Sequence, residues 1–150
     1  MSRPELLLSN QLCFLVHRLD REIAARYRPL LAELGLTYPQ YLAMLALWER
    51  GVLTVGELCA LLYLDTGTVS PLVKRLEAAG LVERRRSPDD ERTVVVRLSE
   101  AGRALERKAE RVPGAMAGCL LSDPGDYASL KSTLSGLIAR LESSDCSTKP

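Results

Sequence analysis

The chain has 150 residues, 47% of them hydrophobic and 26% charged, which is typical of one soluble globular domain with an added dimerisation element. This balance excludes a disordered tail and a membrane protein, and the net charge of +1 identifies no partner. One histidine and four cysteines without a close pair exclude the common zinc spacings, so we expect no metal and no cofactor. Polar residues follow the early leucines, so no signal-peptide core forms, and we expect a cytoplasmic protein without a membrane segment.

The first predicted element is a long helix over about residues 9–32. Its larger apolar side chains recur every three or four positions, at Leu12, Leu15, Leu19, Ile23 and Tyr27. Pro29 is expected to distort the last turn, and Gly35 to end the segment.

Three shorter helices follow, and each has a capping residue at its start. Thr37 and Thr54 each begin a capping box, because a Gln or Glu stands three residues later, and Asp65 is a third N-cap. The predicted helices run over about residues 37–50, 54–62 and 66–79. Gly51 and Gly80 are expected to close the first and the last of them.

Two strand-like segments, 81–86 and 93–98, flank a turn-rich loop and predict a β-hairpin. After them, Ser99 is expected to cap a helix from about 100 to 120, bent at Pro113 and Gly114. A last helix is predicted from the Asp123 region to about residue 142. The polar residues 143–150 are expected to be disordered.

The order of these elements predicts a mainly α fold with a small β-hairpin. Two short capped helices followed by a hairpin are typical of a winged helix-turn-helix, which binds duplex DNA. The second short helix starts with small hydrogen-bonding residues and continues with bases, as a helix in the major groove requires. The candidate DNA-binding residues on that helix are Thr66, Thr68, Ser70, Lys74 and Arg75.

The hairpin supplies the second candidate DNA contact. Residues 74–111 hold eleven basic and eight acidic residues, whereas the segments before and after are slightly acidic. Arg84 and Arg86 lie on one arm, and Arg92 on the loop suits insertion into a narrow minor groove. Asp90 is expected to pair with a neighbouring arginine and hold the loop open. A solvated helix end and surface strand are the alternative interpretation of the charge cluster.

Several segments resemble a known family. Residues 76–82 (LEAAGLV), 89–93 (DDERT) and 98–102 (LSEAG) resemble the multiple antibiotic resistance regulator (MarR) family of winged-helix repressors. Narrower matches resemble its organic hydroperoxide-resistance group: 10–14 (NQLCF), 27–31 (YRPLL), 36–42 (LTYPQYL) and 62–68 (LYLDTGT). The resemblance covers about residues 9–140. It implies a homodimer that binds double-stranded operator DNA and releases it when an organic hydroperoxide oxidises a cysteine.

The resemblance implies that Cys13 is the peroxide sensor, with Tyr27 and Tyr38 as hydrogen-bond donors to its thiolate. Phe14 and His17 are expected in the same pocket, although a partly buried helical histidine is the alternative for His17. Because about 21 Å of helix separates Cys13 from Tyr27, the contact would have to cross a dimer interface. The two-cysteine members of the group imply that Cys119 resolves the oxidised Cys13 as an intersubunit disulfide.

The same resemblance implies four regions. They are an N-terminal dimerisation and sensor helix (1–35), a winged helix-turn-helix (36–100), C-terminal dimerisation helices (101–142) and the tail (143–150). A stripe formed by Leu130, Leu134, Leu137, Ile138 and Leu141 is expected in the dimer or domain core.

Two other functions stay open at this point. The chain is alternatively a repressor of this type that a small aromatic ligand releases. A thiol peroxidase is the third possibility, but neither a βαβ framework nor a Cys-x-x-Cys motif supports an enzyme. Cys59 is expected to be a small core residue, and Cys146 receives no role.

Overall fold

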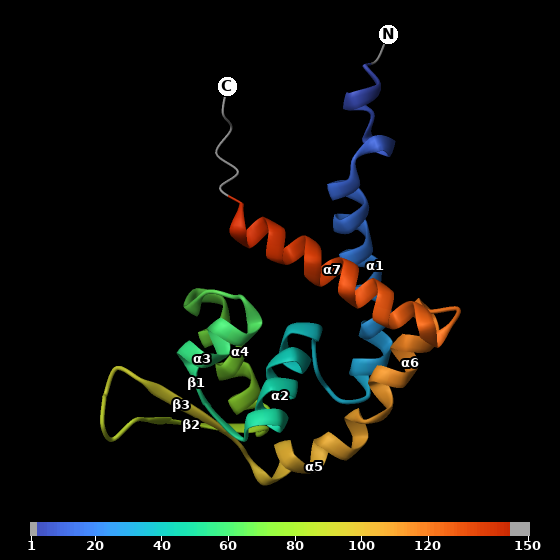
Figure 1. The fold of residues 1–150 in the computed structure, drawn as a ribbon. Coiled ribbons are helices and arrows are strands. Elements are labelled where there is room, and N and C mark those ends of the chain that lie inside the picture. Colours follow the sequence, from blue (N-terminus) through green and yellow to red (C-terminus); the bar gives the residue numbers. More distant parts are fainter. Residues whose placement is uncertain (1–2, 145–150) are drawn as a thin grey trace. The chain divides into compact units, whose positions relative to one another are not determined.

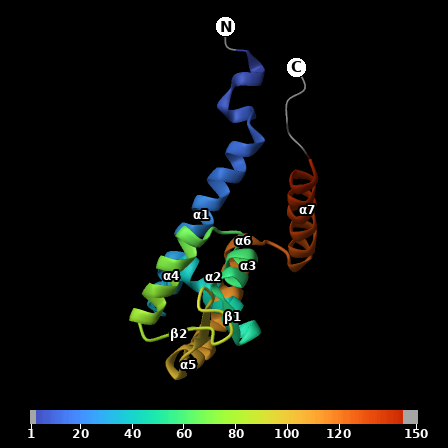
Figure 2. The same cartoon turned by 90° about the vertical axis from the view of Figure 1, so that its left-hand side faces the viewer.

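The computed structural model describes residues 3–144, which fall into two units divided between Val112 and Pro113. In the first unit, the 3-10 turns Pro4–Leu6 and Leu8–Asn10 precede a mixed set of elements (Figures 1 and 2). These are α1 (Leu12–Ala32), α2 (Tyr38–Arg50), β1 (Val52–Thr54), α3 (Val55–Leu62), α4 (Thr66–Ala78), β2 (Val82–Arg86), β3 (Val94–Leu98) and α5 (Glu100–Ala109). The second unit contains most of α6 (Arg111–Leu120) and all of α7 (Pro124–Ser143).

The predicted helix caps are confirmed. Thr37 and Thr54 form complete capping boxes, in which side chain and backbone exchange hydrogen bonds with Gln40 and Glu57. Asp65 accepts a 2.7 Å hydrogen bond from the Thr68 backbone N–H at the start of α4. These side chains satisfy N–H groups that the first helical turn leaves without a partner, so the three helices begin where the sequence places them.

The sheet has one strand more than the sequence predicted. The three strands are antiparallel in the order β1-β3-β2, so β3 pairs with the expected hairpin partner and also with β1. Leu53 of β1 lies opposite Val96, and both side chains are buried. The three residues of β1 are too few to show the alternation of apolar and polar side chains that identifies a strand. Only their pairing with the distant β3 makes them one.

Two predictions for the C-terminal part need correction. The helix expected over 100–120 is interrupted at Glu110, not bent at Pro113 and Gly114. Pro113 has no N–H for the carbonyl of Ala109, four residues earlier, so the break falls one turn before the proline. The first helix, in contrast, ends at Ala32 as predicted, with Pro29 in its last turn. The predicted disordered tail begins too early, because Ser143 still belongs to α7; residues 145–150 lie outside the described residues.

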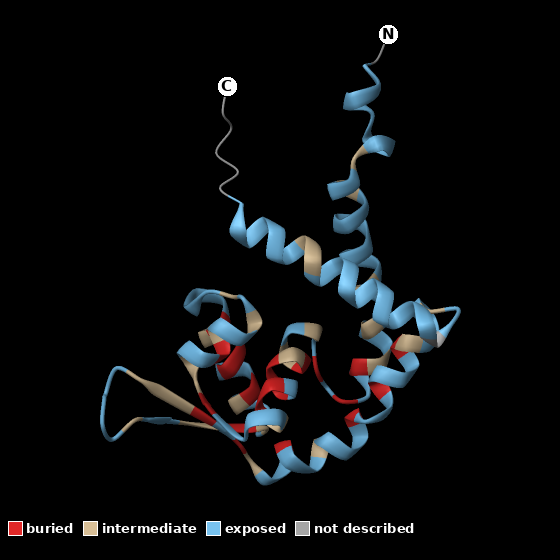
Figure 3. Ribbon diagram, viewed as in Figure 1, coloured by how far each residue is buried: buried red, intermediate tan, exposed pale blue. Residues whose placement is uncertain are grey.

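The core of the first unit lies where α2, α3 and α4 meet the sheet (Figure 3). Its fully buried side chains include Tyr41, Met44, Leu47, Leu58, Val69, Val73, Leu76 and Val96. Leu31, near the end of α1, is the buried residue of that helix, whereas the first half of α1 is largely exposed. The helix-turn-helix is therefore rigidly supported, and the start of α1 is not.

A close backbone contact holds α5 against the end of α4. Ser99 Oγ donates a 2.6 Å hydrogen bond to the Gly80 carbonyl, and the Ser99 N–H donates to the Leu81 carbonyl at 3.0 Å. A Cβ on Gly102 would lie 2.0 Å from the Leu81 carbonyl oxygen, so only glycine permits this approach. None of the described helices is long and apolar enough to cross a membrane.

Candidate functional site

Helix α4 turns one face to the core and the other to solvent. Val69, Leu72, Val73 and Leu76 are buried, whereas Thr66, Thr68, Lys74 and Arg75 are exposed and Ser70 is half-buried. Four of the five candidate DNA-binding residues of α4 therefore share its solvent side. Hydroxyls come first and bases one or two turns later, which is the order that base edges and flanking phosphates require.

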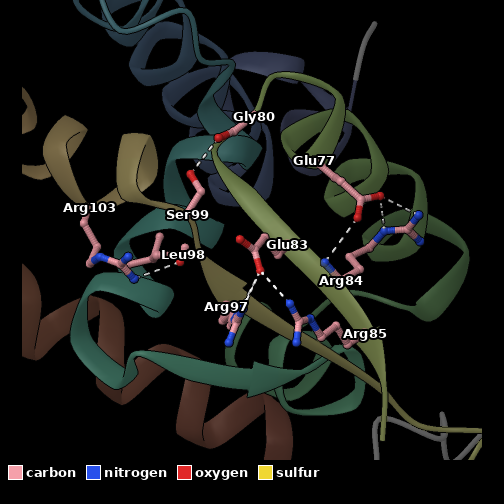
Figure 4. A network of polar contacts seen from close by, with 9 residues as sticks. All are labelled: Glu77, Gly80, Glu83, Arg84, Arg85, Arg97, Leu98, Ser99 and Arg103. Carbon is pink, nitrogen blue, oxygen red and sulfur yellow. Dashed lines mark hydrogen bonds and ion pairs between the residues drawn. The ribbon is translucent and has the colours of Figure 1, made fainter.

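The arginine cluster of the wing is not uniformly available. Arg84 is held by Glu77 of α4: its Nη2 lies 2.7 Å from Glu77 Oε2, and its backbone N–H donates to Oε1 at 3.2 Å (Figure 4). These hydrogen bonds lower the pKa of the Glu77 carboxyl. Arg84 thus braces β2 against α4, and its predicted role as a DNA contact competes with this pairing.

A second carboxylate gathers two further arginines. Glu83 Oε2 accepts a 2.6 Å hydrogen bond from Arg97 and lies 3.6 Å from Arg85, and the bond from Arg97 lowers the pKa of Glu83 (Figure 4). Arg86 is exposed and has no ion pair within the described residues. With Val94, the three arginines at 84–86 line a hollow of about 300 Å³. Arg86 is the cation of this run that is most available to a phosphate.

The expected pairing of Asp90 with an arginine side chain is wrong. Its carboxylate accepts the backbone N–H of Arg92 at 3.0 Å and the hydroxyl of Thr93 at 2.9 Å, and both bonds lower its pKa. Asp90 therefore shapes the loop through the backbone. The Arg92 side chain is exposed on the loop, as a minor-groove contact requires.

Cys13 lies in the first turn of α1 and is an exposed free thiol. Fourteen residues of uninterrupted helix separate it from Tyr27, or about 21 Å along the axis, although the two differ by only about 40° around it. A single copy therefore does not bring Cys13 to Tyr27. Phe14 is half-buried, and His17 is exposed rather than partly buried as its alternative interpretation required.

The two tyrosines assigned to the sensor do lie together. The rings of Tyr27 and Tyr38 are stacked with centroids 4.4 Å apart, and Tyr41 lies 5.8 Å from Tyr27. Burial, followed by the nearby Asp20, raises the pKa of Tyr38, and burial also raises that of Tyr41. Tyr38 is therefore protonated at neutral pH and able to donate a hydrogen bond to an anion.

The aromatic group continues toward the winged helix. Tyr41 and Trp48 are in edge contact at 6.4 Å, and the Trp48 indole N–H donates a 2.9 Å hydrogen bond to the Gly102 carbonyl. A series of contacting side chains thus leads from Tyr27 and Tyr38 to the junction of α4 and α5.

The family model for transcriptional regulators of the SarA/Rot type matches residues 25–108. The chain is 47% identical to the organic hydroperoxide resistance transcriptional regulator of Bacillus subtilis over 89% of this chain and 91% of that protein. The chain belongs to the MarR family of winged-helix regulators, in its organic hydroperoxide-resistance group.

Solved structures agree with this family. Reduced AbfR of Staphylococcus epidermidis bound to DNA is similar with a TM-score of 0.82 and 32% identity, over 95% of this chain and 97% of that one. AbfR in its disulfide form is similar with a TM-score of 0.62 and 35% identity, over 90% of each chain. The fold of this MarR-family chain is thus that of a winged-helix regulator.

Two apolar stripes of this regulator are exposed. Leu12, Leu15, Val16 and Leu19 of α1 are 45–63% exposed and share one face. On α7, Leu130, Leu134, Ile138 and Leu141 are 44–68% exposed, and Leu137 is half-buried. Helical spacing in the sequence already indicated most residues of both stripes. Their exposure in a single copy of the chain is seen only in the structure.

The other cysteines of the regulator differ in setting. Cys119 lies in α6 as an exposed free thiol. Cys59 is half-buried against the core, as expected, with its Sγ 3.8 Å from the hydroxyl of Thr66. Cys146 lies outside the described residues. No group of three metal-ligating side chains occurs in the described part of the chain.

Sequence reasoning missed two features beside α4. Glu77 pairs with Arg84 across the turn between helix and strand, which no local pattern indicates. Tyr63, just before α4, is exposed and has a left-handed backbone conformation. The sequence could have indicated that Tyr63 is exposed, because it stands between Leu62 and Leu64, which both pack against the core.

Proposed function

We propose that this chain is a dimeric, redox-sensing repressor in the cytoplasm that binds duplex operator DNA and releases it when an organic hydroperoxide oxidises Cys13. The observation that carries the proposal is the 47% identity with the Bacillus subtilis organic hydroperoxide resistance regulator, together with an exposed cysteine in the first turn of α1. The names of the relatives are those of transcriptional regulators, which favours a regulator over an enzyme.

The DNA contacts of the proposed repressor come from α4 and the wing. In this arrangement α4 enters the major groove, where Thr66, Thr68 and Ser70 reach bases or phosphates and Lys74 and Arg75 hold phosphates. Arg86 and Arg92 of the wing reach the adjacent backbone and minor groove. Arg84 and Asp90 act mainly by positioning the wing, because Glu77 and the loop backbone occupy them.

The sensor of the proposed repressor requires two copies of the chain. In one copy Cys13 is about 21 Å from Tyr27 along α1, so the Tyr27–Tyr38 pair has to meet the Cys13 of a partner whose α1 runs antiparallel. The exposed stripes of α1 and α7 supply the apolar surface for such a dimer. The dimerisation regions are therefore 1–35 and 101–142, on either side of the winged helix.

The proposed chemistry uses two thiols. The thiolate of Cys13 attacks one peroxide oxygen, the O–O bond breaks, and the alcohol leaves after gaining a proton, so that Cys13 becomes a sulfenic acid. The thiol of Cys119 from the partner then attacks the Cys13 sulfur, water leaves, and an intersubunit disulfide forms.

The test uses a duplex that the reduced wild-type protein enriches from a random-sequence pool. Cumene hydroperoxide is expected to abolish binding of the wild-type protein, and dithiothreitol to restore it. Cys13→Ser is expected to bind the duplex and resist release, while Cys146→Ser responds as the wild-type does. If Cys13→Ser is released normally, the sensor assignment is wrong. If a small aromatic acid alone causes release, the ligand-controlled alternative is correct.

Mixing the two single-cysteine variants tests the connectivity. A dimer of one Cys13→Ser and one Cys119→Ser protomer retains one thiol of each kind, on different copies. An intersubunit disulfide predicts a covalent dimer from this mixture and none from either variant alone. One hydroperoxide consumed per Cys13, without turnover, separates a sensor from a peroxidase.

A further inference from the structure

Tyr63 has a backbone conformation that its side chain does not favour. Its φ is 53° and its ψ 41°, in the left-handed region. The other described residues with positive φ are glycines: Gly35, Gly51 and Gly80. A Cβ in this region approaches the next carbonyl oxygen, which is why glycine is preferred there.

The turn at Tyr63 needs the left-handed backbone but not the tyrosine. The N–H groups of Tyr63 and Leu64 both donate to the Cys59 carbonyl, which closes α3. The turn directs Leu64 back to the core, whereas the Tyr63 side chain is 82% exposed. That side chain makes no hydrogen bond or ring contact with the part of the chain that the structure describes. Packing within the chain therefore gives no reason for an aromatic residue there.

The position of Tyr63 beside α4 gives a reason for an aromatic residue at this turn. It lies two residues before Asp65, the N-cap of α4. No lysine or arginine occurs between residues 51 and 73, so this part of the helix-turn-helix supplies no cation of its own to the DNA backbone. Phosphate contacts from this segment therefore have to come from uncharged hydrogen-bond donors. Among these, the phenol of Tyr63 has the longest side chain.

We propose that the Tyr63 hydroxyl donates a hydrogen bond to a phosphate oxygen of the DNA strand beside the groove that α4 enters. This inference rests on the proposed function. Residues immediately before a recognition helix lie where the sugar-phosphate backbone crosses the protein, and tyrosine is among the side chains that bind phosphates. Strained backbone at such a place is a common sign of a functional residue.

The experiment compares Tyr63→Phe with the wild-type protein on the enriched duplex over a series of salt concentrations. Losing a hydrogen bond to a charged acceptor in each of the two protomers is expected to weaken binding about 100-fold. Tyrosine carries no charge, so the slope of affinity against salt should not change. Lys74→Gln, in contrast, should lower that slope by about two per dimer.

Tyr63→Gly separates the contact from the fold. Glycine relieves the left-handed strain and removes no buried contact, so the melting temperature should stay equal or rise by about 2 °C while DNA binding weakens as in Tyr63→Phe. Wild-type affinity in Tyr63→Phe would overturn this inference and leave the proposed function intact. Failure of the wild-type protein to enrich any duplex would instead overturn the proposed function.

Discussion

The winged helix and the first half of α1 differ in whether one copy of the chain buries their apolar residues and brings their functional residues together. In the winged helix, α4 packs on an apolar core and the wing is braced by Glu77, so the DNA face is already formed. At the start of α1, the apolar residues are exposed and the thiol of Cys13 is far from the tyrosines assigned to it. The DNA-reading part is thus formed within one chain, whereas the proposed sensor requires two copies.

This difference couples sensing to DNA binding without a long path. If the sensor is built at the interface of two copies, a covalent change there alters how the copies are placed, and with them the spacing of two rigid α4 helices. The winged helix itself need not deform.

The largest expected effect is at Gly102 in the winged-helix unit. Gly102→Ala places a Cβ 2.0 Å from the Leu81 carbonyl oxygen, so α5 has to move away from the end of α4. We expect a loss of about 3 kcal/mol in unfolding free energy by chemical denaturation. Gly56→Ala in α3 meets its nearest atom at 3.9 Å and should be neutral or slightly stabilising. Equal stability of the two variants would contradict the rigid junction.

The next effect concerns the exposed stripe of α1. Leu15→Asp places a charge where the proposed dimer buries leucine, and we expect the dimer to dissociate at least about 100-fold more readily. Arg21→Asp, on the opposite face of the same helix, should leave the dimer intact. Analytical ultracentrifugation measures both. An unchanged dimer in Leu15→Asp would show that this face of α1 is not the interface.

Local chemistry explains which features the sequence predicted. Thr37, Thr54 and Asp65 cap their own helices within three residues, so their roles are visible in a short window. The strand β1 depends on Arg97 and its neighbours, more than forty residues away, and no window contains both. For that reason the sequence predicts the hairpin of β2 and β3 but not β1, the third strand of the sheet.

The candidate site divides in the same way. The exposed residues of α4 follow from helical spacing, because the buried Val69, Val73 and Leu76 fix which side faces outward. The pairing of Arg84 with Glu77, and of Asp90 with backbone rather than arginine, depends on side-chain geometry that spacing does not contain. The stacking of Tyr27 on Tyr38 joins two helices, and the resemblance to a family indicated it where periodicity did not.

A smaller effect is expected at the aromatic group that joins the sensor tyrosines to the winged helix. Trp48→Phe keeps the edge contact with Tyr41 but removes the N–H that binds the Gly102 carbonyl. We expect a loss of about 1 kcal/mol in stability, since one part-buried acceptor loses its partner. The measurement is chemical denaturation followed by far-ultraviolet circular dichroism. No loss in this variant would show that water replaces the indole there.

The smallest effect is a pH dependence of stability that arises in the winged helix. Hydrogen bonds from Arg84 lower the pKa of Glu77 below its ordinary value of 4.5, so its contribution to stability is present above that value and is lost as the pH falls through the lower folded pKa. Glu77→Gln should therefore flatten the decline in denaturation midpoint between about pH 6 and pH 3.5. The decline should not vanish, because the pKa values of Glu83 and Asp90 are lowered too. A variant that declines as steeply as the wild-type would show that the brace between α4 and the wing does not stabilise the DNA face.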